Sequence, residues 1–89
     1  MSETRIRFAT FREFLKDLGF TQIRLSEAHL AFQHDATDTL LALPVYKANQ
    51  NVAPHHLAMF RVQLDAKGIL EADVFDRLVA SAGLRQTAS

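Results

Sequence analysis

The chain has 89 residues, no cysteine, and ten basic residues balanced by ten acidic ones. This length predicts one small domain, residues 1–89, which buries about 60–65% of the surface that its unfolded chain exposes. The hydrophobic fraction of 48% is that of a globular protein. The absence of cysteine excludes a disulfide framework and a thiolate zinc site.

The sequence also bears on location and partners. No apolar run is long enough to span a bilayer, and the N-terminal segment MSETRIRF lacks the apolar core of a signal peptide. We therefore expect a cytoplasmic protein without membrane association. The zero net charge argues against nonspecific binding of nucleic acid over the whole surface, although it is compatible with a local basic patch.

A first helix is predicted over residues 10–18. Thr10 and Glu13 have the spacing of a capping box. Apolar residues then recur at helical spacing, namely Phe11, Phe14, Leu15 and Leu18. Gly19 is placed for a left-handed C-terminal cap, with Phe20 folding back onto the last turn.

Three short segments then alternate between apolar and polar residues, which predicts an antiparallel meander. They span residues 20–25, 29–34 and 40–45. The corner between the first two is Ser26-Glu27-Ala28. Pro44 predicts that the third strand lies at an edge of the sheet or ends there. We expect the apolar face to pack against helices and the opposite face to stay open, with Arg24, His29 and Gln33 on it.

Two further helices complete the predicted fold. The second begins near Pro54 and ends at Gly68, with an apolar stripe of Leu57, Phe60 and Leu64. The third spans residues 72–82 and ends at Gly83. Its apolar side consists of Val74, Phe75, Leu78, Val79 and Ala82. The prediction is a two-layer α+β domain with an α-β-β-β-α core at about residues 10–70 and an additional C-terminal helix.

Several short motifs occur in a characteristic order. They are Leu18-Gly19-Phe20, Glu27-Ala28-His29 followed by Phe32, Leu43-Pro44-Val45, and the segment FRVQLDAKGI over residues 60–69. In this order they resemble the "GW" or "GF", "GSH", Pro-containing and "ILRQAGI" motifs of the HicA-type toxins of bacterial toxin–antitoxin pairs. The resemblance covers residues 10–79. It implies a fold related to double-stranded-RNA-binding domains.

The resemblance also implies a function. HicA-type toxins are metal-independent endoribonucleases that cleave mRNA, and a HicB-like antitoxin would cover the open face of the sheet. The catalytic histidine of the family falls on His29. Two departures leave alternatives open, because Glu27-Ala28 replaces Gly-Ser and this chain is neutral where the family is usually basic. The alternatives are an inactive RNA- or protein-binding module of the same fold, and an interaction domain that forms homo-oligomers.

The residues themselves allow such chemistry. In cleavage without a metal ion, one group takes the proton of the 2′-hydroxyl and another protonates the leaving 5′-oxygen. An imidazole with its ordinary pKa of about 6.5 can do either, and His29 is the candidate. Arg24 and Lys47 are candidates to stabilise charge on the phosphorus centre. The pair His55 and His56, at the start of the second helix, is a candidate to contact the RNA backbone.

The remaining polar and aromatic candidates have structural interpretations. His34 lies beside a turn and is expected to be solvated. Tyr46 is expected to be an ordinary aromatic residue at a strand end, with stacking on a base as the alternative. The spacing of the histidines matches no recognised pattern of metal ligands, and no cofactor is expected.

Overall fold

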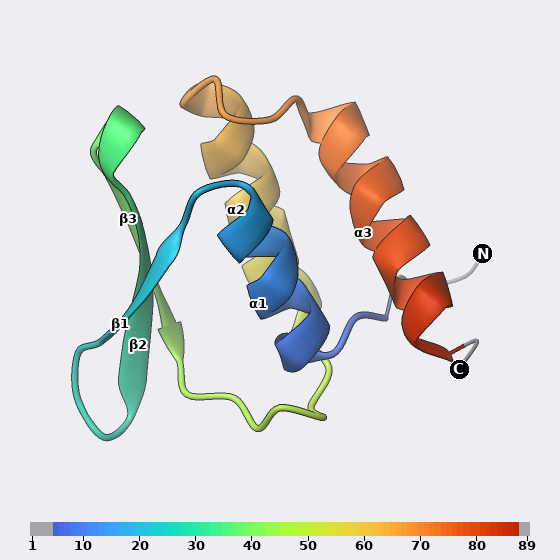
Figure 1. The fold of residues 1–89 in the computed structure, drawn as a ribbon, viewed down its shortest axis with the longest axis horizontal. Helices are drawn as coiled ribbons and strands as arrows, with labels where there is room; N and C mark the ends of the chain where they lie inside the picture. Colours follow the sequence, from blue (N-terminus) through green and yellow to red (C-terminus); the bar gives the residue numbers. More distant parts are fainter. Residues whose placement is uncertain (1–4, 88–89) are drawn as a thin grey trace.

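The computed structural model describes residues 5–87. Figure 1 shows one helix, three strands and then two helices. The bounds are α1 Phe8–Asp17, β1 Thr21–Arg24, β2 His29–His34, β3 Thr39–Pro44, α2 Pro54–Ala66 and α3 Ala72–Thr87. A short 3-10 turn, Asp35–Thr37, links β2 and β3. The predicted α+β domain with its additional C-terminal helix is therefore confirmed.

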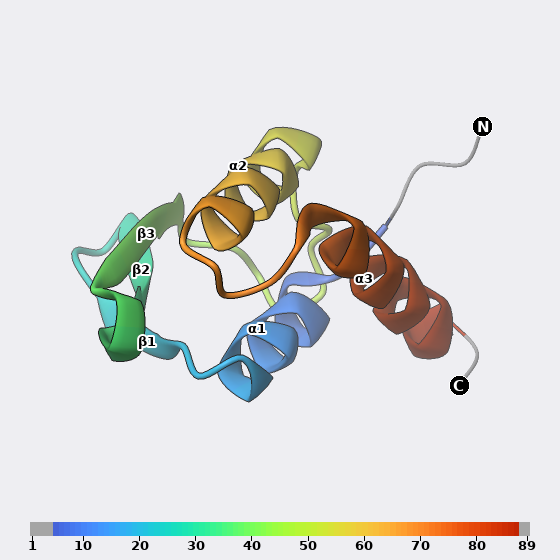
Figure 2. The ribbon, with the colours of Figure 1, turned by 90° about the horizontal axis from the view of Figure 1, so that it is seen from above.

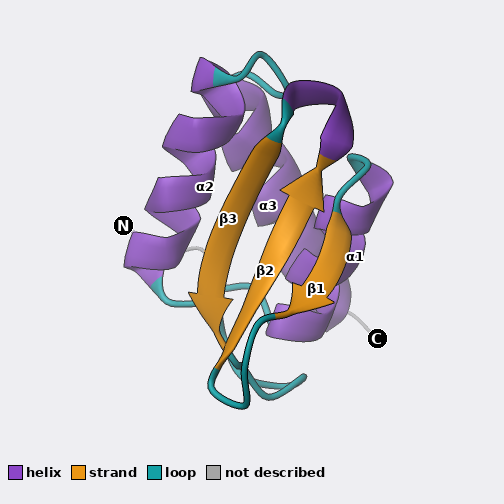
Figure 3. Cartoon of the chain, turned by 90° about the vertical axis from the view of Figure 1, so that its left-hand side faces the viewer, coloured by secondary structure: helices purple, strands orange, loops and turns teal. Residues whose placement is uncertain are grey.

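The elements are arranged around a small antiparallel sheet of order β1-β2-β3. Helices α1 and α2 lie against one face of the sheet, and α3 packs on the side of these helices that is away from the sheet (Figures 1 and 2). The other face of the sheet is turned toward the viewer in Figure 3, with all three helices behind it. We call this uncovered surface the outer face.

Phenylalanine side chains join the layers. Phe32 of β2, Phe11 of α1 and Phe60 of α2 are at most 1% exposed. The Phe11 and Phe60 rings meet edge to face, with their centroids 5.1 Å apart, which is a favourable geometry for an aromatic pair. Phe75 of α3 also lies edge to face with Phe11, at 6.5 Å. The C-terminal helix is thus part of the core.

Helix α1 begins earlier than predicted and without the predicted capping box. Its N-cap is Arg7, and no side chain caps it. Backbone carbonyls from the connection after β3 satisfy the first donors instead, because the Phe8 N–H donates to the Gln50 oxygen (2.8 Å) and the Ala9 N–H to the Ala48 oxygen (3.0 Å). A helix start whose free N–H groups already have partners does not need a side-chain cap.

The predicted glycine caps at the ends of α1 and α2 are confirmed. Gly19 has φ +100° and Gly68 has φ +70°, a left-handed conformation that glycine adopts readily. The Phe20 N–H donates to the Leu15 oxygen, and the Ile69 N–H donates to the Leu64 oxygen. These long bonds are those of the Schellman motif.

Gly83 was predicted to end the third helix, and this prediction is wrong. Helix α3 continues to Thr87, and Gly83 lies buried within it. A Cβ atom on Gly83 would lie 2.5 Å from the backbone oxygen of Arg5. The glycine therefore permits close approach of the N-terminal segment. That segment also reaches the core, because Ile6 is fully buried, outside the predicted core of residues 10–70.

The predicted face of Arg24 is also wrong. The register places Arg24 opposite Leu30, and Leu30 opposite Leu43. Directly opposed residues share a face of the sheet, and both leucines are buried beneath the helices. The hydrogen bonds of the β1–β2 corner set this register. A shift of one residue would move every side chain of the strand to the opposite face of the sheet. Ile23, rather than Arg24, lies on the outer face with His29 and Gln33.

Candidate functional site

The corner between β1 and β2 positions His29. Ser26 Oγ accepts hydrogen bonds from the backbone N–H groups of Ala28 (3.2 Å) and His29 (3.1 Å). The His29 oxygen accepts bonds from the Leu25 and Ser26 N–H groups, both at 3.1 Å. A serine hydroxyl that accepts hydrogen bonds from backbone N–H groups of its own turn commonly stabilises a tight turn. The backbone at His29 is thus fixed from both sides.

The His29 side chain is exposed at the first residue of β2, as the sequence predicted. Within residues 5–87 its ring forms no hydrogen bond, and no ion pair joins it to Glu27. Across the sheet it lies opposite Pro44. The imidazole is therefore open to solvent and free to meet a ligand, without a neighbouring acid or base to orient it.

Arg24 serves the corner. Its Nε donates to the Ser26 oxygen at 2.8 Å, and its Nη2 donates to the Glu27 oxygen at 3.3 Å. The guanidinium is exposed and keeps further donors for an anion. Its hydrogen bonds therefore stabilise the turn that precedes His29.

The other predicted site residues lie at the same end of the domain. In Figures 1 and 3 the β1–β2 corner, the connection after β3 and the first turn of α2 are all found at the lower end. Lys47 belongs to that connection, where its N–H bonds the Gln50 side chain at 3.2 Å. His55 and His56 belong to the first turn of α2. The structure thus gathers these residues at one end, while it separates Arg24 and His29 onto opposite faces.

The two histidines of α2 differ in their surroundings. Tyr46 Oη bonds His56 Nδ1 and also accepts the Ala53 N–H at 2.9 Å. The His55 and His56 ring centroids are 4.1 Å apart. Burial, and then the charge of His55, lower the pKa of His56. His56 is therefore a structural partner of Tyr46, whereas His55 remains exposed.

Tyr46 is a packing residue. Its ring stacks on Phe8 with centroids 5.5 Å apart, and its hydroxyl bonds the residue that precedes α2. This hydroxyl contact was not predicted from the sequence. The signal that could have indicated it is a tyrosine shortly before a helix that has a histidine in its first turn.

His34 is half-buried and bonded, so the prediction that it is solvated is wrong. Its Nε2 donates to the Leu18 oxygen at 3.2 Å, since a carbonyl only accepts. Its Nδ1 can then accept from the Thr37 hydroxyl at 2.9 Å. The ring also packs against Phe20 at 5.0 Å. His34 therefore joins the end of β2 to the end of α1.

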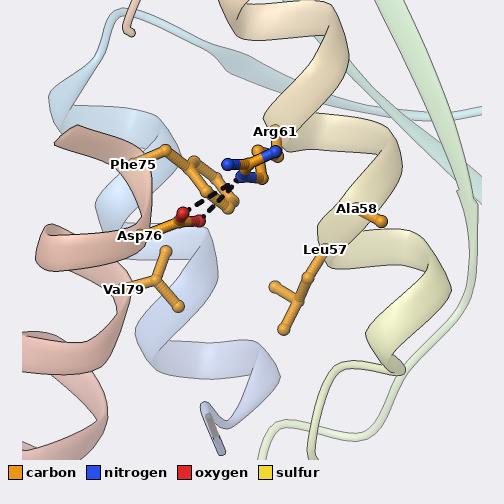
Figure 4. A pocket seen from close by; sticks show the side chains of 6 residues that line it. All are labelled: Leu57, Ala58, Arg61, Phe75, Asp76 and Val79. Carbon is orange, nitrogen blue, oxygen red and sulfur yellow. Dashed lines mark hydrogen bonds and ion pairs between the residues drawn. The ribbon is translucent and has the colours of Figure 1, made fainter. Parts of the chain in front are cut away.

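A separate cavity of about 210 Å³ lies between α2 and α3 (Figure 4). Its lining is Leu57, Ala58, Arg61, Phe75, Asp76 and Val79. Arg61 Nε donates to both carboxylate oxygens of Asp76, at 2.9 and 3.1 Å. This hydrogen bond and the charge of Asp76 raise the pKa of Arg61. The two charged groups therefore pair with each other, and no local sequence pattern indicates this contact between two helices.

Residues 5–87 contain no group of three or more His, Cys, Asp or Glu side chains able to bind a metal ion. None of the helices described is long and apolar enough to cross a membrane.

Comparison of the chain with protein-family models, curated proteins and solved structures finds no match. The geometry itself establishes a small α-β-β-β-α-α domain with a three-stranded antiparallel sheet and an exposed histidine at the start of the central strand.

Proposed function

We propose that this domain is a HicA-like toxin, a metal-independent ribonuclease in which His29 acts on mRNA as the general acid or base. The observation that carries the proposal is the exposed imidazole on a corner fixed by backbone hydrogen bonds. The resemblance to HicA-type toxins supports the same residue, because the catalytic histidine of that family falls on His29. A HicB-like antitoxin would restrain the activity by covering the outer face.

The chemistry needs only the RNA itself and a proton-transfer group. The 2′-hydroxyl oxygen bonds to phosphorus as its proton leaves, and the bond from phosphorus to the 5′-oxygen breaks as that oxygen gains a proton. The products are a 2′,3′-cyclic phosphate and a 5′-hydroxyl end. General acid–base catalysis of this kind contributes about 10²–10⁴-fold. A single histidine without an orienting partner would give a slow enzyme.

Cations near this end of the domain would attract the RNA. Lys47 and His55 are exposed, on the connection and on the first turn of α2, and the positive end of the helix dipole favours phosphate there. Arg24 lies on the opposite face of the sheet from His29, so its remaining donors would contact the RNA only where the strand passes around the β1–β2 corner. His56 would contribute through Tyr46, by fixing the start of α2.

The direct test is cleavage of a labelled single-stranded RNA by the wild type, His29→Gln and the control Lys67→Gln, which changes an exposed residue at the opposite end of α2. Excess EDTA excludes a contaminating metal nuclease, and a 2′-deoxy substrate tests the role of the hydroxyl. We expect cleavage in EDTA by the wild type and the control, at least 100-fold slower cleavage by His29→Gln, and none of the 2′-deoxy substrate. Equal cleavage by His29→Gln would remove His29 from the chemistry.

A second function, an inactive binding module of the same fold, is favoured by the composition of the outer face. The strand residues on it are Thr21, Ile23, His29, Ala31, Gln33, Leu40, Ala42 and Pro44. None of them is Asp, Glu, Lys or Arg, so this face offers no permanent cation to phosphate and suits a protein partner. Salt-dependent RNA binding without cleavage, or no RNA binding at all, would favour this function.

A further inference from the structure

A cavity of about 340 Å³ lies between α1 and the neighbouring edge of the sheet. It is lined by Arg12, Glu13, Lys16, Phe20, Gln22 and Phe32. We propose that this cavity binds a nucleotide, with its phosphate on Arg12 and Lys16 and its base against the aromatic floor. The volume is at the lower end of the range of ligand pockets, about 300–1,000 Å³, and suits one nucleotide.

The two cations of the cavity have no anionic partner within the described chain. Arg12 and Lys16 are four residues apart on α1, so they lie on the same face of the helix. Neither forms an ion pair with another residue of 5–87, and the Arg12 guanidinium lies 5.7 Å from the centre of the Phe8 ring. Like charges at this spacing repel each other. Glu13 also lines the cavity without pairing with either cation, so the lining has one excess positive charge, which a bound phosphate would offset.

The floor of the cavity is aromatic. It is formed by Phe20 and Phe32, which are 4% and 1% exposed, so each ring offers only a small part of its surface. Aromatic rings pack favourably against another aromatic system, such as a base. The floor therefore distinguishes a nucleotide from a bare anion, which would gain nothing from it.

Gln22 supplies a side chain that can form hydrogen bonds with the edge of the base. It lies opposite Phe32 in the register of the sheet, and therefore on the same face. Its side chain is exposed and forms no hydrogen bond within residues 5–87. A carboxamide offers both a donor and an acceptor, which is the combination that the edges of bases require.

This site does not depend on the proposed cleavage at His29. Phe32 follows His29 by three residues on β2, about 10 Å along the strand, and faces the opposite side of the sheet. The shared chemistry is a phosphate monoester on a planar base. It can come from a free mononucleotide or from the 5′ end of an RNA chain that continues around β1.

The test is a titration of the ¹⁵N-labelled domain with AMP, followed by NMR and calorimetry. His29→Ala is used as the parent protein, so that failure of this proposal is distinct from failure of the cleavage proposal. We expect AMP to shift the amide signals of Lys16, Phe20 and Gln22, and inorganic phosphate to bind at least 10-fold more weakly. Absence of shifts with AMP up to 10 mM, or equal binding of phosphate, would overturn the proposal.

Variants locate the contact. Lys16→Gln, which removes a charge from an exposed side chain, should weaken AMP binding about 10-fold, and Gln22→Leu should weaken it less. Lys67→Gln, at the end of α2, is the matched control and should not change it. Equal weakening by Lys16→Gln and the control would overturn the proposal. Tighter binding of a 5′-phosphorylated tetranucleotide than of AMP would assign the site to an RNA end, and equal binding to a free nucleotide.

Discussion

Substitution of Gly83 by alanine tests the close contact between α3 and the N-terminal segment. In an open helix this change would stabilise the protein by about 0.8–1.0 kcal/mol, because alanine has the higher helix propensity. At Gly83, however, the new Cβ would lie 2.5 Å from the Arg5 oxygen. Overpacking of this kind costs about 1–3 kcal/mol. The difference is a net loss of up to about 2 kcal/mol.

The size of the loss depends on whether the Arg5 backbone can move. The gap must widen by about 0.9 Å to reach an ordinary contact distance of 3.4 Å. The same segment is tied elsewhere, since the Val52 N–H bonds the Ile6 oxygen at 2.9 Å and the Gln86 side chain bonds the Arg5 oxygen at 3.3 Å. Movement of Arg5 would therefore disturb these bonds as well.

Urea unfolding followed by circular dichroism measures this effect, and hydrogen exchange of the Val52 amide reports on the segment itself. For a domain of this size, a loss of about 2 kcal/mol would correspond to a fall in Tm of about 8–16 °C. Gly68→Ala is an informative comparison. It has positive φ but no atom within 4 Å of the new Cβ, so it measures backbone strain without a clash. A Gly83→Ala variant more stable than the wild type would refute the reasoning.

Three further predictions concern polar contacts. His34→Leu should lower the free energy of unfolding by about 1–3 kcal/mol, because it leaves the Leu18 oxygen and the Thr37 hydroxyl without this partner; an unchanged urea midpoint would contradict the bonded role. The lowered pKa of His56 means that the unfolded chain takes up this proton more readily, so stability should fall as pH decreases through 6.5 and level off below the folded-state pKa. Tm measured from pH 8 to pH 5 should show this fall, and His56→Gln should reduce it. Arg61→Gln should leave the urea midpoint unchanged, since the ion pair with Asp76 is exposed, and a marked loss would show that the pair matters more than its exposure suggests.

The sequence predicted those features that depend on neighbours in the chain. The caps at Gly19 and Gly68 and the strand that begins at His29 follow from local patterns, and the structure has all of them. The errors arise where the deciding partner is distant. Thr10 does not cap α1, because carbonyls from residues 48 and 50 already bond the helix start. Gly83 does not end α3, because its partner is the backbone of Arg5.

The residues of the candidate site also fall into two groups, those whose position depends on neighbours in the chain and those whose position depends on distant residues. The exposed position of His29 follows from its place after the corner, whereas the face of Arg24 depends on a register that the strand pattern leaves undetermined. The bond between Tyr46 and His56 joins residues ten apart in the sequence, across the irregular connection that precedes α2. The cavity beside α1 needs three elements to be assembled before it exists. No local pattern contains that information.

The contacts between the first and last elements have a consequence for synthesis. Phe11 packs against Phe75, and Gly83 packs against Arg5, so the packing of α1 and of the segment before it is completed by residues that the ribosome adds much later. Domains fold as units as they leave the ribosome, beginning from the N-terminal side. Here the sheet and the first two helices must wait, with apolar side chains uncovered, until residue 83 has emerged. A pause in translation before that point would prolong the interval in which the nascent chain needs chaperones.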